Sequence, residues 1–132
     1  MKTAVLDSYA LLAFLFGERG HQRVLDLLQR VAAVSQALLI AAPNWAEVRC
    51  VSQRKVRAAR WGEAREKLLG LPLDIVPADQ TLAEIAGEIK ATKRMSLADC
   101  FAAALARQRR AELYTGDPEF RQVEKDISII WL

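Results

Sequence analysis

The feature that most constrains the fold is the alternation of short apolar segments with longer amphipathic ones along the chain. Five short, mostly apolar runs are expected to be strands: residues 3–6, 38–42, 73–76, 112–115 and 128–132. The segments between them repeat apolar residues at helical spacing, and we expect helices over 9–16, 20–33, 45–54, 58–69, 79–92 and 96–110. Short strands separated by helices indicate a parallel sheet that is covered on both faces. The sequence therefore predicts an α/β fold, a three-layer α/β/α sandwich with a mainly parallel five-stranded sheet.

Length and composition agree with one domain spanning residues 1–132. The hydrophobic content of 52% and the charged content of 27% are those of an ordinary globular protein. No apolar run approaches the roughly 18 residues needed to span a bilayer, and Asp7 interrupts the apolar run near the N-terminus before it could resemble a secretory signal. We therefore expect a cytoplasmic protein without a membrane partner. Cys50 and Cys100 fall inside expected helices and are interpreted as small core residues, so no disulfide framework is indicated.

Four acidic residues stand where an expected strand gives way to a helix or where a helix begins: Asp7, Glu47, Asp99 and Asp117. In a parallel sheet with right-handed crossovers, these positions meet at the carboxyl edge of the strands. Carboxylates a few ångströms apart repel one another and raise each other's pKa. The cost is on the order of 1 kcal/mol per pair even in water. A divalent cation with a preference for oxygen ligands, Mg²⁺ or Mn²⁺, would relieve that repulsion.

Each of these acids also has a structural interpretation as a helix cap. An acid or a hydroxyl at the start of a helix accepts hydrogen bonds from the first free backbone N–H groups. Asp79 also begins an expected helix, and we assign it only this capping role. The candidate caps are Asp7, Asn44 with Glu47 three residues on, Ser96 with Asp99, and Asp117 before Pro118.

Basic residues are concentrated in a few stretches of the chain, whose net charge is +3 and whose pI is about 9.1. They can be ordinary solvated helix faces, or together they can form a basic rim that holds RNA phosphates around the acidic centre. The residues concerned are Arg49, Arg54, Lys55, Arg57, Arg60, Arg65, Lys67, Lys90, Lys93, Arg94, Arg107, Arg109 and Arg110.

Four segments of the chain, in this order, resemble the motifs of PIN-domain nucleases. They are Asp7-Ser8 after the first strand, N-W-A-E-V at 44–48, S-L-A-D-C-F-A-A-A-L-A at 96–106 and Y-T-G-D-P-E-F at 114–120. The resemblance covers essentially the whole chain, and small members of this kind are mostly VapC-type toxins of toxin–antitoxin pairs. It implies a metal-dependent endoribonuclease with an RNA substrate and an antitoxin partner.

The resemblance also implies roles for individual residues. Asp7 and Asp99 match the family's principal ligands for Mg²⁺ or Mn²⁺, while Glu47 and Asp117 complete the acidic pocket. Ser8 and Thr115 match supporting hydroxyl positions. All four acids are thereby implied as catalytic residues that bind the metal.

Other catalytic classes find little support in the sequence. His21 is the only histidine and is expected at the surface or at a helix cap, which excludes a ribonuclease with paired histidines. A phosphatase with a nucleophilic aspartate would want a second aspartate where Tyr9 stands, and no phosphate-binding glycine loop is present. A catalytically silent binding module and a housekeeping RNA-processing nuclease stay open as alternatives.

The expected first helix, 9–16, has more apolar residues than one buried stripe requires. It can be sandwiched inside the core, or it can provide a surface for the antitoxin or for a second copy in a homodimer. We expect a homodimer, with either arrangement of the helix left open.

Overall fold

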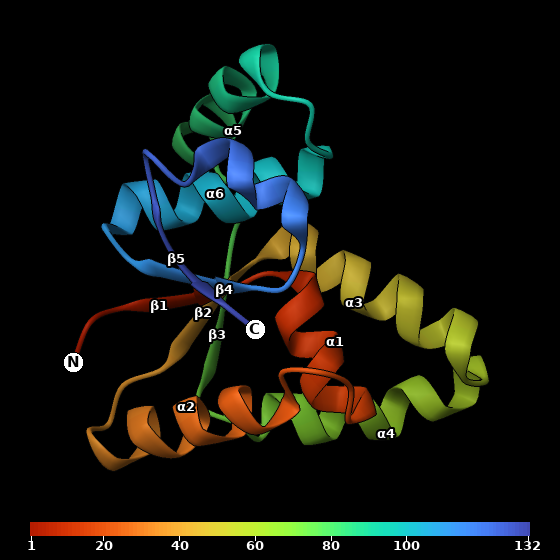
Figure 1. Ribbon diagram of the computed structural model, residues 1–132. Coiled ribbons are helices and arrows are strands. Elements are labelled where there is room, and N and C mark those ends of the chain that lie inside the picture. The colour runs from red at the N-terminus through yellow and green to blue at the C-terminus, as the bar shows by residue number, and fades with distance from the viewer.

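The computed structural model describes all residues 1–132 and arranges them as five strands, six α-helices and one 3₁₀-helix (Figure 1). The strands are β1 (Ala4–Leu6), β2 (Leu38–Ala41), β3 (Leu73–Val76), β4 (Glu112–Thr115) and β5 (Ser128–Trp131). The helices are α1 (Ser8–Phe16), α2 (His21–Ala33), α3 (Ala42–Lys55), α4 (Ala58–Leu69), α5 (Gln80–Thr92), α6 (Leu97–Arg109) and the 3₁₀-helix η1 (Pro118–Val123).

The strands form a single sheet in the order β3-β2-β1-β4-β5, and every neighbouring pair is parallel. The expected α/β fold is therefore confirmed, with a sheet that is wholly rather than mainly parallel. The first strand lies in the centre, where Val5 is in register with Leu39 of β2 and Leu113 of β4. The carboxyl ends of β1, β2 and β4 thus lie side by side.

Helices cover both faces of the sheet, as the three-layer prediction requires. In Figure 1, α5 and α6 lie with η1 on one face, while α2 and α4 lie on the other. Successive strand residues alternate between the two cores: Val5 packs with the α5–α6 layer, whereas Leu6 packs with the α1, α2 and α4 layer. Both residues are fully buried.

The start of α3 differs from the prediction. Pro43 lies between the expected strand 38–42 and the expected helix 45–54, but in the structure it stands in the first turn of the helix, where its missing N–H is no loss. Ala41 is the N-cap and no side chain caps this helix, so the predicted capping box of Asn44 and Glu47 is wrong. Asn44 is instead fully buried and donates a 3.2 Å hydrogen bond from Nδ2 to the carbonyl of Ala98 in α6.

The prediction for one of the two cysteines is also wrong. Cys50 is exposed on α3, whereas Cys100 is buried as expected. His21 is the half-buried first residue of α2; its ring stacks on Phe14 with centroids 5.3 Å apart, and its Nδ1 lies 2.8 Å from the Phe14 carbonyl in α1.

The first helix lies partly in the core and partly at the surface. Leu11 and Phe14 of α1 are buried in the core, while Leu12 and Leu15 are half-buried and Tyr9 is exposed. Figure 1 places α1 between the sheet and the hairpin that α3 and α4 form. None of the helices has the length and apolar character needed to cross a membrane.

Candidate functional site

Asp7 lies at the centre of the carboxyl edge, directly after the central strand. One carboxylate oxygen, Oδ1, caps α1 by accepting a 2.9 Å hydrogen bond from the backbone N–H of Ala10. The other, Oδ2, accepts a 2.5 Å hydrogen bond from the hydroxyl of Thr115, at the end of the neighbouring strand β4. The side chain is only 1% exposed. The capping role is therefore confirmed, and it leaves Asp7 buried beside a second strand end.

Asp99 lies at the same edge, but at the start of a helix and not at the end of a strand. It lies in the first turn of α6, and its backbone N–H donates a 3.2 Å hydrogen bond to the hydroxyl of Ser96, the N-cap. Because α6 returns to the amino end of β4, the helix must begin at the carboxyl edge of the sheet. Asp99 is 7% exposed.

Asp117 follows β4 and caps η1, where its Oδ1 accepts a 2.9 Å hydrogen bond from the N–H of Glu119. The backbone N–H of Asp117 donates in turn to the hydroxyl of Thr115 at 3.0 Å. Thr115 is fully buried and uses one hydroxyl both to donate to Asp7 and to accept from Asp117. The threonine therefore ties the two aspartates to each other.

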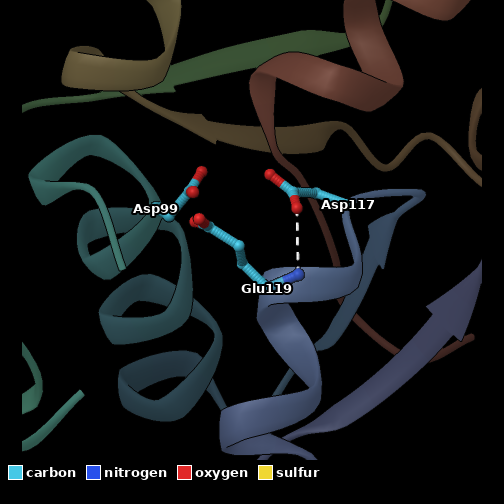
Figure 2. Close-up of side chains that lie close together, drawn as sticks. All are labelled: Asp99, Asp117 and Glu119. Carbon is cyan, nitrogen blue, oxygen red and sulfur yellow. Dashed lines mark hydrogen bonds between the residues drawn. The ribbon is translucent and has the colours of Figure 1, made fainter. Parts of the chain in front are cut away.

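Figure 2 shows the carboxylates of Asp99, Asp117 and Glu119 pointing toward one another from α6 and from the start of η1. One ligand oxygen from each lies within 4.8 Å of the others. Glu119 was not among the candidate site residues, because an acid in the first turn of a helix has an ordinary interpretation as a favourable partner of the helix dipole. Its position two residues after Asp117, itself at the carboxyl edge, is the signal that could have found it.

Glu47 lies in the second turn of α3 and is half-buried. Its carboxylate accepts a hydrogen bond from the hydroxyl of Ser8, the first residue of α1. Neither Glu47 nor Asp7 places an oxygen inside the tight group of three carboxylates. The structure thus brings Asp99, Asp117 and Glu119 into one group and holds Asp7 and Glu47 beside it through the two hydroxyl residues. We call these five acids the acidic site.

Ionisation of the two buried acids of the site is unfavourable without a bound cation. Burial raises the pKa of Asp7 from 3.8 to about 7, although the hydrogen bonds from Thr115 and Ala10 lower it, and the charges of Asp99 and Asp117 raise it further. Burial likewise raises the pKa of Asp99 to about 7, with the Ser96 hydroxyl lowering it and nearby carboxylates adding to the rise.

No side-chain cation compensates these charges. The four ion pairs of the structure join Lys55 to Glu18, Arg60 to Glu63, Arg65 to Glu66 and Arg107 to Glu88, all outside the acidic site. Buried charge is costly unless it is paired or binds a metal. A set of oxygen donors without sulfur or imidazole fits a hard divalent cation such as Mg²⁺ or Mn²⁺. The residues present therefore fit the metal that the sequence implied.

The residues of the expected basic rim do not form one continuous surface. Arg54 and Arg57 belong to the α3–α4 turn, where four basic residues line one pocket. Arg107 and Arg110 lie at the opposite end of α6, in a pocket shared with Ser128, the first residue of β5. A helix of 13 residues is about 20 Å long, so these arginines are at the amino edge of the sheet, and their assignment to the rim was wrong.

The family model described as PIN domain matches residues 4–126. No curated protein matches the sequence.

Several solved structures share the fold. A VapBC2 complex from Rickettsia felis bound to a promoter DNA fragment superposes with a TM-score of 0.79 at 14% identity, with 98% of each chain covered. A DNA-bound VapBC complex from Salmonella typhimurium gives 0.77 at 18% identity, again over 98% of each chain. VapC20 of Mycobacterium tuberculosis, described as a toxin that cleaves the sarcin-ricin loop, gives 0.71 at 16% identity over 92% of this chain and 95% of that one. At these identities the similarity establishes the fold.

Proposed function

The chain belongs to the PIN-domain family, and from this premise we propose that it is a metal-dependent endoribonuclease, the toxin of a toxin–antitoxin pair. The observation that carries the proposal is the acidic site, a group of carboxylates at one sheet edge that no side-chain cation neutralises. Asp7 and Asp99 are buried, Glu47 and Asp117 are half-buried, and Glu119 is exposed. Structural scaffolding would not require this grouping, since each helix could be capped by a hydroxyl or an isolated acid.

In the proposed mechanism, Asp7, Asp99 and Asp117 would hold the cation, and Glu47 and Glu119 would complete the oxygen donor set. When bound, Mg²⁺ or Mn²⁺ would supply a Lewis acid that lowers the pKa of a water and neutralises charge on the phosphodiester. Thr115 holds Asp7 and Asp117 in fixed relative positions through its shared hydroxyl. Ser8 fixes the carboxylate of Glu47 in the same way. These contacts orient the donor oxygens, which is the role that outer partners of metal ligands commonly have.

The raised pKa values of Asp7 and Asp99 couple metal binding to proton release. Near pH 7 each carboxyl is divided between its protonated and charged forms. Both would have to be charged to bind a cation, so binding near pH 7 would release into solvent the fraction of a proton, about half on average, that each aspartate still carries. We therefore expect activity to rise with pH across neutrality.

The partners belong to the same proposal. VapBC structures are complexes of toxin with antitoxin, and their similarity in fold supports an antitoxin that binds this chain. The basic α3–α4 turn supports an RNA substrate, because phosphates are held by lysine and arginine. The homodimer stays a prediction, for which the half-buried apolar residues of α1 are the basis.

The test is RNA cleavage by the purified chain with Mg²⁺ or Mn²⁺, compared with cleavage after chelation. Asp7→Asn and Asp99→Asn should each reduce the rate by at least about 100-fold, since even an outer partner of a metal ligand is worth 10- to 100-fold. Asp79→Asn is the matched control, because Asp79 caps α5 with the same geometry outside the acidic site. Variants of Asp7 and Asp99 that cleave RNA as fast as the wild type would overturn the proposal and favour a catalytically silent binding module.

A further inference from the structure

An exposed tyrosine lies beside the acidic site without any role in holding the acids. Tyr9 stands two residues after Asp7, in the first turn of α1, and 37% of its surface is exposed. It is the one aromatic among the large hydrophobic residues that the structure exposes. None of the side-chain hydrogen bonds of the structure involves its hydroxyl, which leaves the polar end of the ring open to a ligand.

The ring of Tyr9 is held against the backbone of the β4–η1 connection. A Cβ atom at Gly116 would lie 2.2 Å from Cε1 and 2.4 Å from Cζ of the ring, so the ring in this position occupies the space that a side chain at residue 116 would take. Gly116 does not have a positive φ, so its backbone conformation does not call for a glycine. Because Gly116 lies between Thr115 and Asp117, the ring lies at the border of the acidic site.

The same side chain forms one wall of a pocket that leads away from the acidic site. The pocket has a volume of about 260 Å³, and its other walls are Leu12, Ala13, Glu18 and Arg19. Glu18 is paired with Lys55, whereas exposed Arg19 makes no ion pair. The pocket thus combines an aromatic ring and two apolar side chains with one uncompensated cation. This is the combination by which proteins stack a base and hold the adjoining phosphate of a single strand.

Resting on the proposed function, we propose that Tyr9 stacks one nucleobase of the RNA strand next to the phosphodiester held at the acidic site, with Arg19 near the following phosphate. The substrate at this position is then an unpaired nucleotide, because a base inside a duplex has no free face for the ring. Stacking tolerates any base, so this subsite selects strand structure rather than sequence. Tyr9 positions the strand and takes no part in the chemistry.

The experiment measures KM and kcat for a single-stranded oligoribonucleotide whose cleavage site has been mapped with the wild type and Mn²⁺. Tyr9→Leu should raise KM by about 10-fold, the expected loss from one base–aromatic stack, with kcat changed far less. Tyr9→Phe, which keeps the ring, should retain the wild-type KM. Val34→Ala, a change at an exposed apolar residue that follows α2, should have no effect.

A second series uses the wild type alone, so the inference does not depend on how a variant folds. Removing the base next to the cleaved phosphate, by an abasic nucleotide, should raise the wild-type KM by about the same factor. On that abasic substrate Tyr9→Leu and the wild type should become equal. If no single base removal changes KM, or if Tyr9→Leu has the wild-type KM on the intact strand, the inference is wrong while the nuclease assignment stands. A wild type that cleaves no RNA with Mn²⁺ overturns both.

Discussion

Asp7 and Asp79 have the same local geometry and opposite surroundings. Each is the N-cap of a helix that follows a strand of the parallel sheet, and in each the Oδ1 atom accepts a 2.9 Å hydrogen bond from the N–H three residues on. Asp7 follows the central strand β1 and is 1% exposed among other carboxylates. Asp79 follows the edge strand β3 and is exposed. The same cap geometry therefore occurs in an aspartate of the acidic site and in an aspartate on the exposed surface.

The position of the strand within the sheet accounts for the difference. The central strand has a neighbour on each side, and the ends of those neighbours bring Thr115 and the start of α3 to Asp7. The edge strand has one neighbour only, so fewer segments meet at its end. A carboxylate acquires a shared environment where several strand ends converge, which agrees with the general location of ligands in open parallel sheets.

The largest expected effect that tests this comparison is on stability as a function of pH. In the metal-free protein Asp7 and Asp99 have pKa values of about 7, above the ordinary 3.8, so the native state binds more protons than the unfolded chain between about pH 4 and pH 7. The contribution of these two groups to the free energy of unfolding should therefore fall as pH rises through this range and level off above it. The fall is on the order of a few kcal/mol, since one pKa unit corresponds to 1.36 kcal/mol.

Urea denaturation in the presence of a chelator, at pH 5 and pH 8, measures that fall. Asp7→Asn should reduce it and should make the metal-free protein more stable than the wild type at pH 8, because the buried charge is gone. Asp79→Asn should reproduce the wild-type dependence. Adding Mn²⁺ at pH 8 should restore stability to the wild type by binding the native state. The same pH dependence in Asp7→Asn and the wild type would contradict the comparison.

A smaller effect is expected from Thr115→Val, which removes the hydroxyl between Asp7 and Asp117 at nearly constant volume. RNA cleavage should fall by about 10- to 100-fold, the usual cost of losing an outer partner of a metal ligand, and Mn²⁺ affinity should fall with it. Thr92→Val is the matched control, because the Thr92 hydroxyl donates only to the Ile89 carbonyl at the end of α5. Equal activity of the two variants would show that the hydroxyl of Thr115 does not orient the acids.

The smallest expected effect concerns the cap outside the site. Asp79→Ala should lower the free energy of unfolding by about 1 kcal/mol, because the N–H of Leu82 loses its acceptor, and RNA cleavage should stay at the wild-type rate. Asp79→Asn, which can still cap the helix, should recover most of that stability. A loss of cleavage in Asp79→Ala at a temperature where it is fully folded would place Asp79 in the functional part of the molecule.

The sequence predicts most of the fold because two signals give the same element boundaries: the spacing of the apolar residues, and the prolines and glycines that end helices and strands. The expected bounds of β3, β4 and α4 coincide with those observed, where prolines or glycines flank clear apolar patterns. The start of α3 could not be found in this way, because a proline is equally compatible with the end of a strand and with the first turn of a helix.

For the site, the sequence and the topology indicate which acids share the carboxyl edge, but side-chain direction decides which of them meet. Glu119 joins Asp99 and Asp117 because a 3₁₀-helix begins at Pro118, and nothing in the local pattern specifies that turn in place of an α-helix. Arg107 and Arg110 were assigned to the rim from their nearness to Asp99 in sequence, which ignores the length of the helix between them. The two ends of one helix therefore lie at opposite edges of the sheet, although their residues are close in sequence.

The hydrogen bond from Asn44 to the Ala98 carbonyl has a consequence for the energy of cation binding. It joins the first turn of α3 to the first turn of α6, the two helices that carry Glu47 and Asp99, and no carboxylate takes part in it. The relative placement of these two acids is therefore set when the chain folds, by a neutral amide in a fully buried position. The free energy of folding offsets the repulsion between the two acids. Little reorganisation of the helices is then left for the proposed binding of a cation. A cation bound as proposed would have to displace protons from Asp7 and Asp99, but it would not have to move the helices that carry Glu47 and Asp99.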